Sequence, residues 1–323
     1  MKFLIIQTAF IGDAILATAV LEKLHAKFPD AKIDLLVRKG NESLFDHHPF
    51  LGKVYVWDKK QGKIKNLFKI AGEIRKEKYD HLINLHRFAS SGIITALSGA
   101  KTKRGFDKNP LSFLFSKKIK HEIGGGTHET ERNQQLIEDL TDLTAAHPKL
   151  YPSRENFRSV EKYKASDYIC IAPTSVWFTK QFPGEKWVNL CDRLPPDLKV
   201  YLLGAPGDFA ACEWILTNSK NKNIFNLSGK LNFLESAALM KDAKMNYVND
   251  SAPMHIASAM DAPTTAIYCS TVPSFGFGPL SANSKIIETK RILQCRPCGL
   301  HGHKACPLGH FECAMSIEIE DML

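Results

Sequence analysis

Two series of alternating strand and helix patterns constrain the fold of this chain more than any other feature of its sequence. The first series consists of strand-like apolar runs and amphipathic helical stretches at residues 3–7, 14–28, 33–37, 64–74, 81–85, 91–97 and 128–140. The second series consists of the same two patterns at residues 168–172, 186–194, 200–203, 208–216, 224–227, 233–241, 245–248 and 265–269. Strands that alternate with helices form parallel sheets through right-handed crossovers, so the sequence predicts an α/β fold.

A stretch without clear periodicity, residues 141–167, separates the two series and contains Pro148, Pro152 and mixed charges. Such a stretch is typical of a passage between domains. A chain of 323 residues also exceeds the size at which a single core usually keeps growing. We therefore predict two doubly wound, Rossmann-like domains at residues 1–155 and 156–323, since the pattern lacks the even repeats of a barrel.

The composition is typical of a soluble globular protein, and the net charge favours an anionic partner. Hydrophobic residues make up 44% of the chain, and no apolar run reaches the roughly 18 residues that span a bilayer. Residues 1–7 predict a first strand and not a signal peptide, so we expect a cytoplasmic protein. The formal charge of +9 favours a nucleotide, a phosphorylated substrate, an anionic lipid or a nucleic acid, without choosing among them.

Residues 248–260 predict a strand, a tight turn and a short helix that starts near Pro253. In a parallel sheet such a turn lies at the carboxyl edge, where the unpaired N–H groups and partial positive charge of a helix N-terminus attract an anion. Asp250, Ser251 and His255 are therefore candidates for binding a phosphate-bearing ligand. The alternative is that Asp250 and Ser251 only cap the helix and that His255 only packs within it.

Two further turns hold candidate site residues. Thr174, Ser175 and Lys180 lie on the loop after the first strand of the second series, where hydroxyls and an ammonium can bind a diphosphate and offset its charge as it leaves. The alternative is an exposed loop with a surface lysine. Gly12 and Asp13 lie where the first strand meets the first helix, so Asp13 is either a general base or an ordinary helix cap.

Four cysteines near the C-terminus form the last candidate group. Cys295, Cys298, Cys306 and Cys313 lie among three histidines, a combination found in tetrahedral zinc sites. The spacing of the second pair is too wide for a firm zinc motif, and reduced thiols that fix a terminal segment are the alternative. The chain lacks the Gly-x-Gly-x-x-Gly, Walker and Gly-x-Ser-x-Gly motifs, which argues against dehydrogenase, P-loop and serine-hydrolase functions.

Short motifs along almost the whole chain, in order, resemble glycosyltransferase family 9, the bacterial ADP-heptose:lipopolysaccharide heptosyltransferases. The motifs are Gly12-Asp13-Ala14, His128-Glu129-Thr130-Glu131-Arg132, Lys180-Gln181-Phe182-Pro183, Leu203-Gly204-Ala205-Pro206-Gly207-Asp208, Ser228-Gly229-Lys230 and Asp250-Ser251-Ala252-Pro253-Met254-His255. The cysteine-containing tail is similar to the end of heptosyltransferase II of that family.

This resemblance implies a GT-B fold, in which two Rossmann-like domains with a cleft between them bind the acceptor and the nucleotide sugar, in that order along the chain. It implies an inverting, metal-independent transfer of a heptose from ADP-heptose to the inner core of lipopolysaccharide, without a cofactor. Asp13 would deprotonate the acceptor hydroxyl, with Gly12 beside it on the acceptor side. Lys180 would neutralise the leaving diphosphate.

The same resemblance implies a set of donor contacts. The expected donor-binding residues are Thr174, Ser175, Lys180, Asp250, Ser251, Ala252 and His255, with the adenosine near Gly204 and the turn from Ser228 to Leu231. The family usually has a glycine at the position of Ala252. The distance at which the backbone approaches the donor there can therefore differ in this chain.

Residues 101–120 carry several lysines together with Phe106, Phe113 and Phe115. They either contact a phosphorylated glycolipid at the inner face of the inner membrane or form a solvated, partly buried helix pair. Two other functions stay open: a GT-B transferase for another nucleotide sugar and glycan, and a nucleotide-sugar-binding protein without turnover. The basic residues are scattered along the chain, so we do not expect a nucleic acid as partner.

Overall fold

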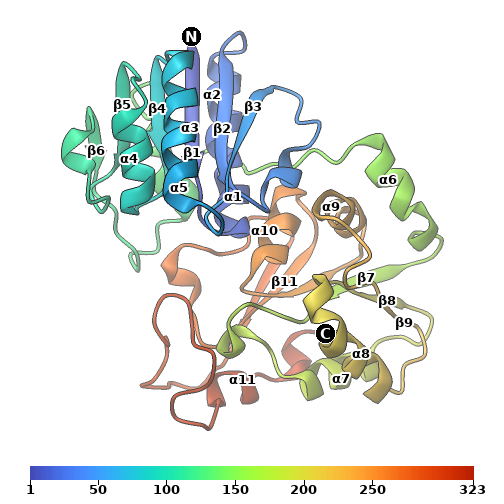
Figure 1. Cartoon of the computed structure of the whole chain (residues 1–323). Helices are drawn as coiled ribbons and strands as arrows, with labels where there is room; N and C mark the ends of the chain where they lie inside the picture. The colour runs from blue at the N-terminus through green and yellow to red at the C-terminus, as the bar shows by residue number, and fades with distance from the viewer. The chain divides into compact units, whose positions relative to one another are not determined.

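The computed structural model describes residues 1–323, which divide into two compact units, Met1–Tyr151 and Pro152–Leu323. Each unit contains one six-stranded parallel sheet (Figure 1). The division falls inside the stretch 141–167 where the sequence loses its periodicity. That stretch is not entirely irregular, because α6 (Arg154–Val160) lies within it and is capped by the Ser153 side chain.

Unit 1 is a doubly wound α/β unit. Its strands are β1 (Lys2–Gln7), β2 (Lys32–Arg38), β3 (Leu51–Trp57), β4 (His81–Asn84), β5 (Thr102–Phe106) and β6 (Lys117–Ile119). Its helices are α1 (Ile11–Leu16), α2 (Thr18–Lys27), α3 (Lys63–Glu77), α4 (Ala89–Leu97) and α5 (Glu129–Gln134). The strand order is β3-β2-β1-β4-β5-β6, so the order reverses between β1 and β4.

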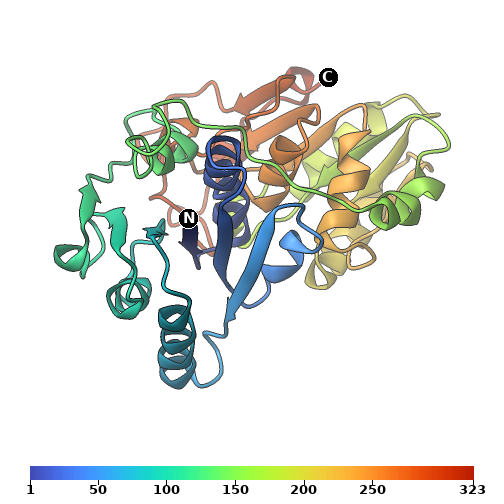
Figure 2. The same cartoon turned by 90° about the horizontal axis from the view of Figure 1, so that it is seen from above.

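The helices of unit 1 cover both faces of its sheet. From β1 the chain adds β2 and β3 on one side of the sheet and β4, β5 and β6 on the other. Because such crossovers are right-handed, the helices of these two halves lie on opposite faces of the sheet. Accordingly, α2 and α5 lie on one face, and α3 and α4 lie side by side on the other (Figure 2). On the second face, Trp57 and Tyr79 pack with residues of α3 and α4 in one buried cluster.

Unit 2 repeats this architecture. Its strands are β7 (Tyr168–Ala172), β8 (Lys199–Leu202), β9 (Ile224–Asn226), β10 (Asn246–Asn249), β11 (Thr264–Tyr268) and β12 (Ser284–Glu288). Its helices after α6 are α7 (Gly184–Arg193), α8 (Phe209–Asn218), α9 (Phe233–Lys241), α10 (Ala252–Ala259) and α11 (Glu312–Met315). The strand order β12-β11-β10-β7-β8-β9 reverses between β7 and β10, as it does between β1 and β4 in unit 1.

The central strands are apolar over most of their length because both faces of a parallel sheet are covered. Every residue of β7 is buried, and so is every residue of β1 after Lys2. Burial of each large aliphatic side chain stabilises the folded chain by about 1.5–3 kcal/mol. In unit 2 the end of the chain joins this core, since Ala314, Ile317 and Ile319 pack with residues of α7 and α8.

Several elements differ from the sequence-based expectation. The helix expected at 14–28 starts earlier and is split at Ala17, where the Thr18 hydroxyl donates to the Ile15 carbonyl. The helix expected at 128–140 ends at Gln134 and continues as turns. Residues 101–120 form β5, a short 3₁₀ turn and β6, and not a helix pair.

Four strands, β3, β5, β6 and β12, were not predicted from the sequence, because they lack a continuous apolar run. Three of them lie at sheet edges and expose part of their length, while β5 carries Lys103 and Arg104. Edge strands need fewer apolar residues because only part of their surface is covered, which is why their sequence signal is weak. No helix in the structure combines the length and the apolar character needed to cross a bilayer.

Candidate active site

The predicted Lys180 and Asp250 meet at the carboxyl edge of the unit 2 sheet. Lys180 Nζ lies 2.7 Å from Asp250 Oδ2, and both side chains are largely buried. The Thr271 hydroxyl donates to the same carboxylate oxygen over 2.6 Å. Asp250 therefore holds the Lys180 ammonium in place, and it is not the simple helix cap that was the alternative.

This cluster lies where the strand order of unit 2 reverses, the position at which open α/β sheets usually bind ligands. Asn249, the last residue of β10, joins the two strands that flank the reversal. Its side-chain Oδ1 accepts from Phe182 N–H at 2.9 Å, and its Nδ2 donates to the carbonyls of Ala172 and Thr174, each at 3.4 Å. Asn249 thus fixes the Lys180 loop against the end of β7.

The helix that follows this edge, α10, has an N-terminus suited to an anion. Ser251 is its N-cap residue with an extended backbone, and the Ser251 side chain makes no capping hydrogen bond. Its hydroxyl lies 3.4 Å from the Asn249 carbonyl instead. Ala252 is the first helical residue, and His255 is buried one turn further on. The partial positive charge of this helix end and the Lys180 ammonium both favour a negatively charged ligand.

The other predicted donor residues lie on neighbouring loops of the same edge. Thr174, with Gln181, Trp187 and Trp214, lines a cavity of about 220 Å³. Ser175 is half-buried, and its carbonyl accepts from the Gln181 side chain.

At the ends of β8 and β9, the Gly204 carbonyl accepts from Gly229 N–H at 2.8 Å, which brings the two predicted adenosine segments together. The Ser228 hydroxyl donates to Asn226, and Leu231 is half-buried. A Cβ at Gly204 would lie 2.8 Å from Asp208 Cβ. The close contact between Gly204 and Asp208 therefore explains the glycine by packing within the unit, whether or not a ligand binds there.

In unit 1, Asp13 is the third residue of α1, and its Oδ2 accepts a hydrogen bond from Phe10 N–H at 3.2 Å. This contact is a helix-capping interaction, but the carboxylate is not an ordinary one. Burial, followed by the negative charge of Glu129, raises its pKa to about 6, and the nearby Arg87 only partly offsets the increase. A carboxylate with that pKa is a stronger base than an exposed one and is still mostly ionised at neutral pH.

Two further cations lie at the carboxyl edge of the unit 1 sheet, from which α1 and Asp13 follow β1. Lys59 Nζ donates to the Thr8 carbonyl over 2.6 Å, and burial together with Arg38 and Lys63 lowers its pKa to about 8. The Arg38 guanidinium lies over the Phe10 ring, 5.1 Å from its centroid. The partners of both cations are uncharged, so their charge is available to an anionic ligand.

A buried chain of polar contacts extends from Arg87. Arg87 NH1 lies 3.3 Å from His121 Nδ1, and His121 Nε2 lies 3.7 Å from Glu129 Oε2. Glu129 is paired with Arg132 at 2.7 Å. Burial alone would raise the pKa of Glu129, but the contacts with His121 and Arg132 outweigh it and lower that pKa. Glu129 is therefore ionised and acts on Asp13 as a fixed negative charge.

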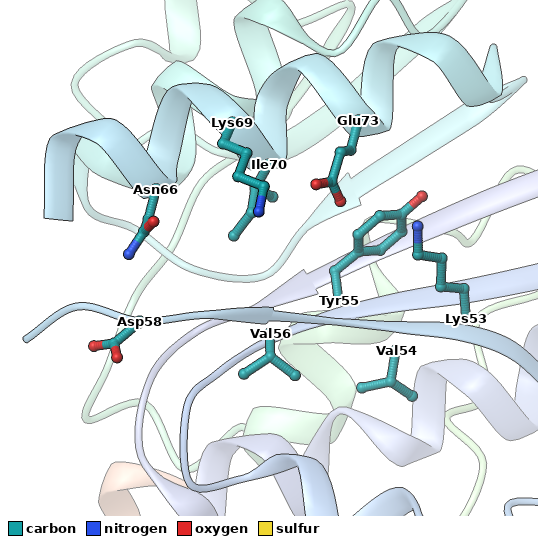
Figure 3. Close-up of a pocket in the computed structure, with 9 residues that line it drawn as sticks. All are labelled: Lys53, Val54, Tyr55, Val56, Asp58, Asn66, Lys69, Ile70 and Glu73. Atoms are coloured by element: carbon teal, nitrogen blue, oxygen red, sulfur yellow. The ribbon is translucent and has the colours of Figure 1, made fainter. Parts of the chain in front are cut away.

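A second cavity, of about 300 Å³, lies away from the predicted site residues, between β3 and α3. Lys53 and Tyr55 project into it from the strand, while Asn66, Lys69 and Glu73 project from the helix (Figure 3). Its lining mixes both signs of charge, and it contains none of the residues assigned to donor or acceptor. Its size alone does not make it the active site, because the strand-order reversals lie elsewhere.

The four C-terminal cysteines are free thiols in the structure. No group of three or more His, Cys, Asp or Glu side chains is arranged to hold a metal ion. Cys295 Sγ lies 4.0 Å from His310 Nε2, and Cys298 Sγ contacts the Cys295 carbonyl.

Comparison with known proteins identifies the family. The model of "Glycosyltransferase family 9 (heptosyltransferase)" matches residues 67–308, about three quarters of the chain. The chain belongs to glycosyltransferase family 9. It is therefore a glycosyltransferase, as the sequence motifs predicted. The matched range contains Lys180 and Asp250, whereas Asp13 lies before it.

Individual relatives agree with this assignment. The chain is 28% identical over 276 residues to lipopolysaccharide heptosyltransferase 3 of Escherichia coli K12, covering 80% of each chain. It is 25% identical over 350 aligned residues to lipopolysaccharide heptosyltransferase 1 of Campylobacter coli, covering 100% of this chain and 97% of the relative.

Among solved structures, the fold is similar to that of E. coli ADP-heptose lps heptosyltransferase II. The TM-score is 0.82 at 20% identity, and the match covers 100% of this chain and 96% of the other. The E. coli heptosyltransferase WaaC, solved with ADP-2-deoxy-2-fluoro heptose, matches with a TM-score of 0.74 at 19% identity over 92% of this chain and 97% of the other. The predicted GT-B fold class is thus confirmed.

Several site residues were not found from the sequence. Thr271 lies 21 residues after Asp250, and only the pairing of β10 with β11 brings them together. Asn249 had a visible signal, since it is a polar residue at the end of an apolar strand directly before the Asp-Ser-Ala-Pro turn. Lys59 and Arg87 also follow strands, but β3 was not predicted, so the position of Lys59 at the sheet edge had no basis in the pattern.

Proposed function

We propose that this chain transfers a heptose from ADP-heptose, or a similar nucleotide sugar, to the inner core of lipopolysaccharide with inversion at the anomeric carbon. The observation that carries the proposal is the cluster of Lys180, Asp250 and Thr271 at the unit 2 reversal, in a member of glycosyltransferase family 9. The names of the relatives support the choice of sugar and acceptor, because they are lipopolysaccharide heptosyltransferases. A similar solved structure, the E. coli heptosyltransferase WaaC, contains ADP-2-deoxy-2-fluoro heptose.

On the donor side, the diphosphate of the nucleotide sugar binds near Lys180 and the N-terminus of α10. Negative charge grows on the diphosphate as the bond to the sugar breaks. The Lys180 ammonium and the backbone dipoles at Ser251 and Ala252 offset that charge in a partly buried setting, where such interactions are stronger than in water. Thr174 and Ser175 contact the donor from the loop after β7, and Gly204 and Ser228 lie near the adenosine.

On the acceptor side, Asp13 acts as the general base. The acceptor hydroxyl oxygen attacks the anomeric carbon as its proton passes to the Asp13 carboxylate, and the bond between that carbon and the diphosphate oxygen breaks. One displacement from the face opposite the leaving group inverts the anomeric centre. The pKa of about 6 suits this role, since Asp13 is ionised at pH 7 and yet holds a proton better than an exposed aspartate.

The cations near Asp13 support an anionic acceptor. Arg38 ends β2, while Lys59 and Arg87 follow β3 and β4, and the partners of the three are an aromatic ring, a carbonyl and an imidazole. Phosphate or carboxylate groups of a lipopolysaccharide core would supply the missing negative charge. A neutral acceptor would leave Arg38 and the partly buried Lys59 without a negatively charged partner.

We also propose a peripheral contact with an anionic membrane, through a smaller set of residues than the sequence suggested. Phe106 and Phe115 are buried and pack within unit 1, so of the two interpretations the contact with a glycolipid does not hold for these two. Phe113 and Leu114 are 70% and 47% exposed on the 3₁₀ turn between β5 and β6, and lysines flank them. Exposed apolar side chains beside cations are suited to the interface of an anionic bilayer.

The experiment for the main proposal combines binding with transfer. A panel of ADP-, GDP-, UDP- and dTDP-sugars is added to the purified protein, and stabilisation by the ADP-sugar is expected because it binds only the native state. Transfer from ADP-heptose to a heptose-free lipopolysaccharide acceptor is then followed by mass, and the product anomer by NMR. Stabilisation by another nucleotide alone, or retention of anomeric configuration, would contradict the proposal.

The membrane contact has its own test. Flotation with anionic vesicles should fall for Phe113→Ser with Leu114→Ser, whereas Leu143→Ser, at a residue 80% exposed elsewhere in the same unit, should float like the parent protein. Equal flotation of all variants, or none at low salt, would remove the membrane contact without affecting the transfer proposal.

A further inference from the structure

The C-terminal segment is hydrogen-bonded to the residue that precedes Lys180. Thr179 N–H donates to the His303 carbonyl over 3.1 Å, and His303 N–H donates to Thr179 Oγ1 over 2.8 Å. Ser270 binds the same residue, with its hydroxyl 3.0 Å from Thr179 Oγ1 and its N–H donating to the Thr179 carbonyl over 3.2 Å. Thr179 is only 1% exposed, so these bonds lie out of water.

Gly302 brings the terminal backbone against the Lys180 side chain itself. Its φ is +75°, a conformation that favours glycine, and a Cβ there would lie 2.7 Å from Thr179 Oγ1 and 3.2 Å from Lys180 Cγ. A residue with a side chain could therefore fit only if the Thr179–Lys180 turn moved. The contact fixes the stem of the side chain whose ammonium binds Asp250.

The same segment also fixes the strand end that holds the partner of Lys180. Cys298 N–H donates to the Ser270 carbonyl over 2.8 Å. The Arg296 guanidinium donates to the carbonyls of Cys269 and Thr271, each over 2.8 Å. Since the Thr271 hydroxyl binds Asp250, one stretch of chain supports both sides of the Lys180–Asp250 pair.

We propose that residues 295–303, here called the C-terminal strap, are a positioning element for Lys180 in the transfer reaction. The inference rests on the proposed function, in which Lys180 offsets charge on the leaving diphosphate. A lysine has four rotatable bonds, so holding its side chain in one geometry costs rotamer entropy. The strap supplies this order before the donor binds, which is how preorganised charge stabilises a transition state. No residue of the strap needs to touch the substrate.

The chain offers a matched pair of glycines for the test. Gly302 and Gly309 both have φ of +75°, so alanine introduces the same backbone strain at each, but a Cβ at Gly309 would meet no atom within 4 Å. We expect Gly302→Ala to lower kcat by about tenfold or more, with a smaller change in donor KM, because the lost interaction acts mainly in the transition state. Gly309→Ala should stay within about twofold of the parent kcat.

A second comparison keeps the proposal testable if Gly302→Ala fails to fold. Thr179→Val removes the hydroxyl that accepts from His303 and Ser270, while Thr179→Ser keeps it. Thr179→Val should lower kcat, and Thr179→Ser should restore it. His303→Ala should be neutral in this assay, because both strap bonds of His303 use its backbone.

A double variant with Lys180 distinguishes a positioning role of the strap from a general loss of structure. In a Lys180→Met background, Gly302→Ala should cause little further loss, since residues that act through the same group are not additive. If the parent enzyme transfers sugar and Gly302→Ala matches Gly309→Ala, or if the losses add fully, the strap proposal is refuted. If the parent protein transfers no sugar, the proposed function fails instead.

Discussion

The raised pKa of Asp13 makes a quantitative prediction for the pH dependence of transfer. An increase from 3.8 to about 6 corresponds to about 3 kcal/mol against the ionised form. With a pKa of about 6 the carboxylate is about 90% ionised at pH 7 and about 10% ionised at pH 5. We therefore expect kcat/KM to fall about tenfold between these two pH values. An aspartate at 3.8 would lose almost nothing over the same range.

The assay is the initial rate of ADP release at low substrate concentration from pH 5 to pH 8, with Glu129→Gln as the diagnostic variant. Because the Glu129 charge raises the pKa of Asp13, its removal should move the acid limb of the profile to lower pH. Thermal melting of the variant is the control, since Glu129 also pairs with Arg132. A profile that stays flat to pH 5, or a limb that does not move in folded Glu129→Gln, would refute the assignment of Asp13 as the base.

The raised pKa of Asp13 also makes a prediction about stability. Stability should fall as pH rises through the pKa, whereas the rate of transfer should rise. Because the folded-state pKa lies above the unfolded value, the folded protein binds more protons between about pH 4 and pH 6, and stability falls as pH rises through that window. At pH 7 the ionised Asp13 costs up to about 3 kcal/mol. Asp13→Asn keeps an oxygen that can accept from Phe10 N–H, so it should abolish turnover and yet raise Tm by a few degrees.

Three further predictions concern other residues. Burial and then His25 lower the pKa of His48 to about 4, so stability should fall as pH drops from about 6.5 to 4, by up to about 3 kcal/mol, and His48→Phe should flatten that fall in urea titrations. Asn249→Ala leaves Phe182 N–H unpaired and should cost about 1–3 kcal/mol in the same titration, with a further loss of kcat. Lys59→Met should raise KM for the acceptor while leaving donor KM unchanged, and an effect on the donor alone would contradict its place on the acceptor side.

The sequence predicted the buried strands and the turns that follow them, because both have local signals. β1 is apolar between Lys2 and Gln7, β7 is apolar throughout, and Asp250-Ser251 precedes a helix start. It did not predict the partners of those turns, because they are joined through the sheet. Thr271 reaches Asp250 only because β11 pairs with β10, and Gly302 reaches Lys180 only because the chain end returns to the α7–α8 face.

Asp13 illustrates why a local pattern left two interpretations open. The pattern Gly12-Asp13 at a helix start indicates a cap, and the carboxylate does accept from Phe10 N–H. The feature that distinguishes it is the raised pKa, which arises from burial and from Glu129, more than a hundred residues away in the chain. A capping carboxylate normally gains from being ionised, because the helix N-terminus is positive. Here the surroundings reverse that preference.

The two units share one strand order but carry opposite electrostatic arrangements at their reversals. In unit 2 the Lys180 ammonium is already paired with Asp250, so a diphosphate that binds there competes with a carboxylate for the cation. In the proposed reaction, Lys180 would then bind the donor most strongly as negative charge builds on the diphosphate, which favours the transition state over the ground state. In unit 1, Arg38 and Lys59 have uncharged partners, so in the proposed reaction they would attract an anionic acceptor without first leaving a carboxylate, while Asp13 has a pKa raised by its surroundings. In the proposed reaction, the same fold would therefore perform two tasks, because the charges that follow corresponding strands differ.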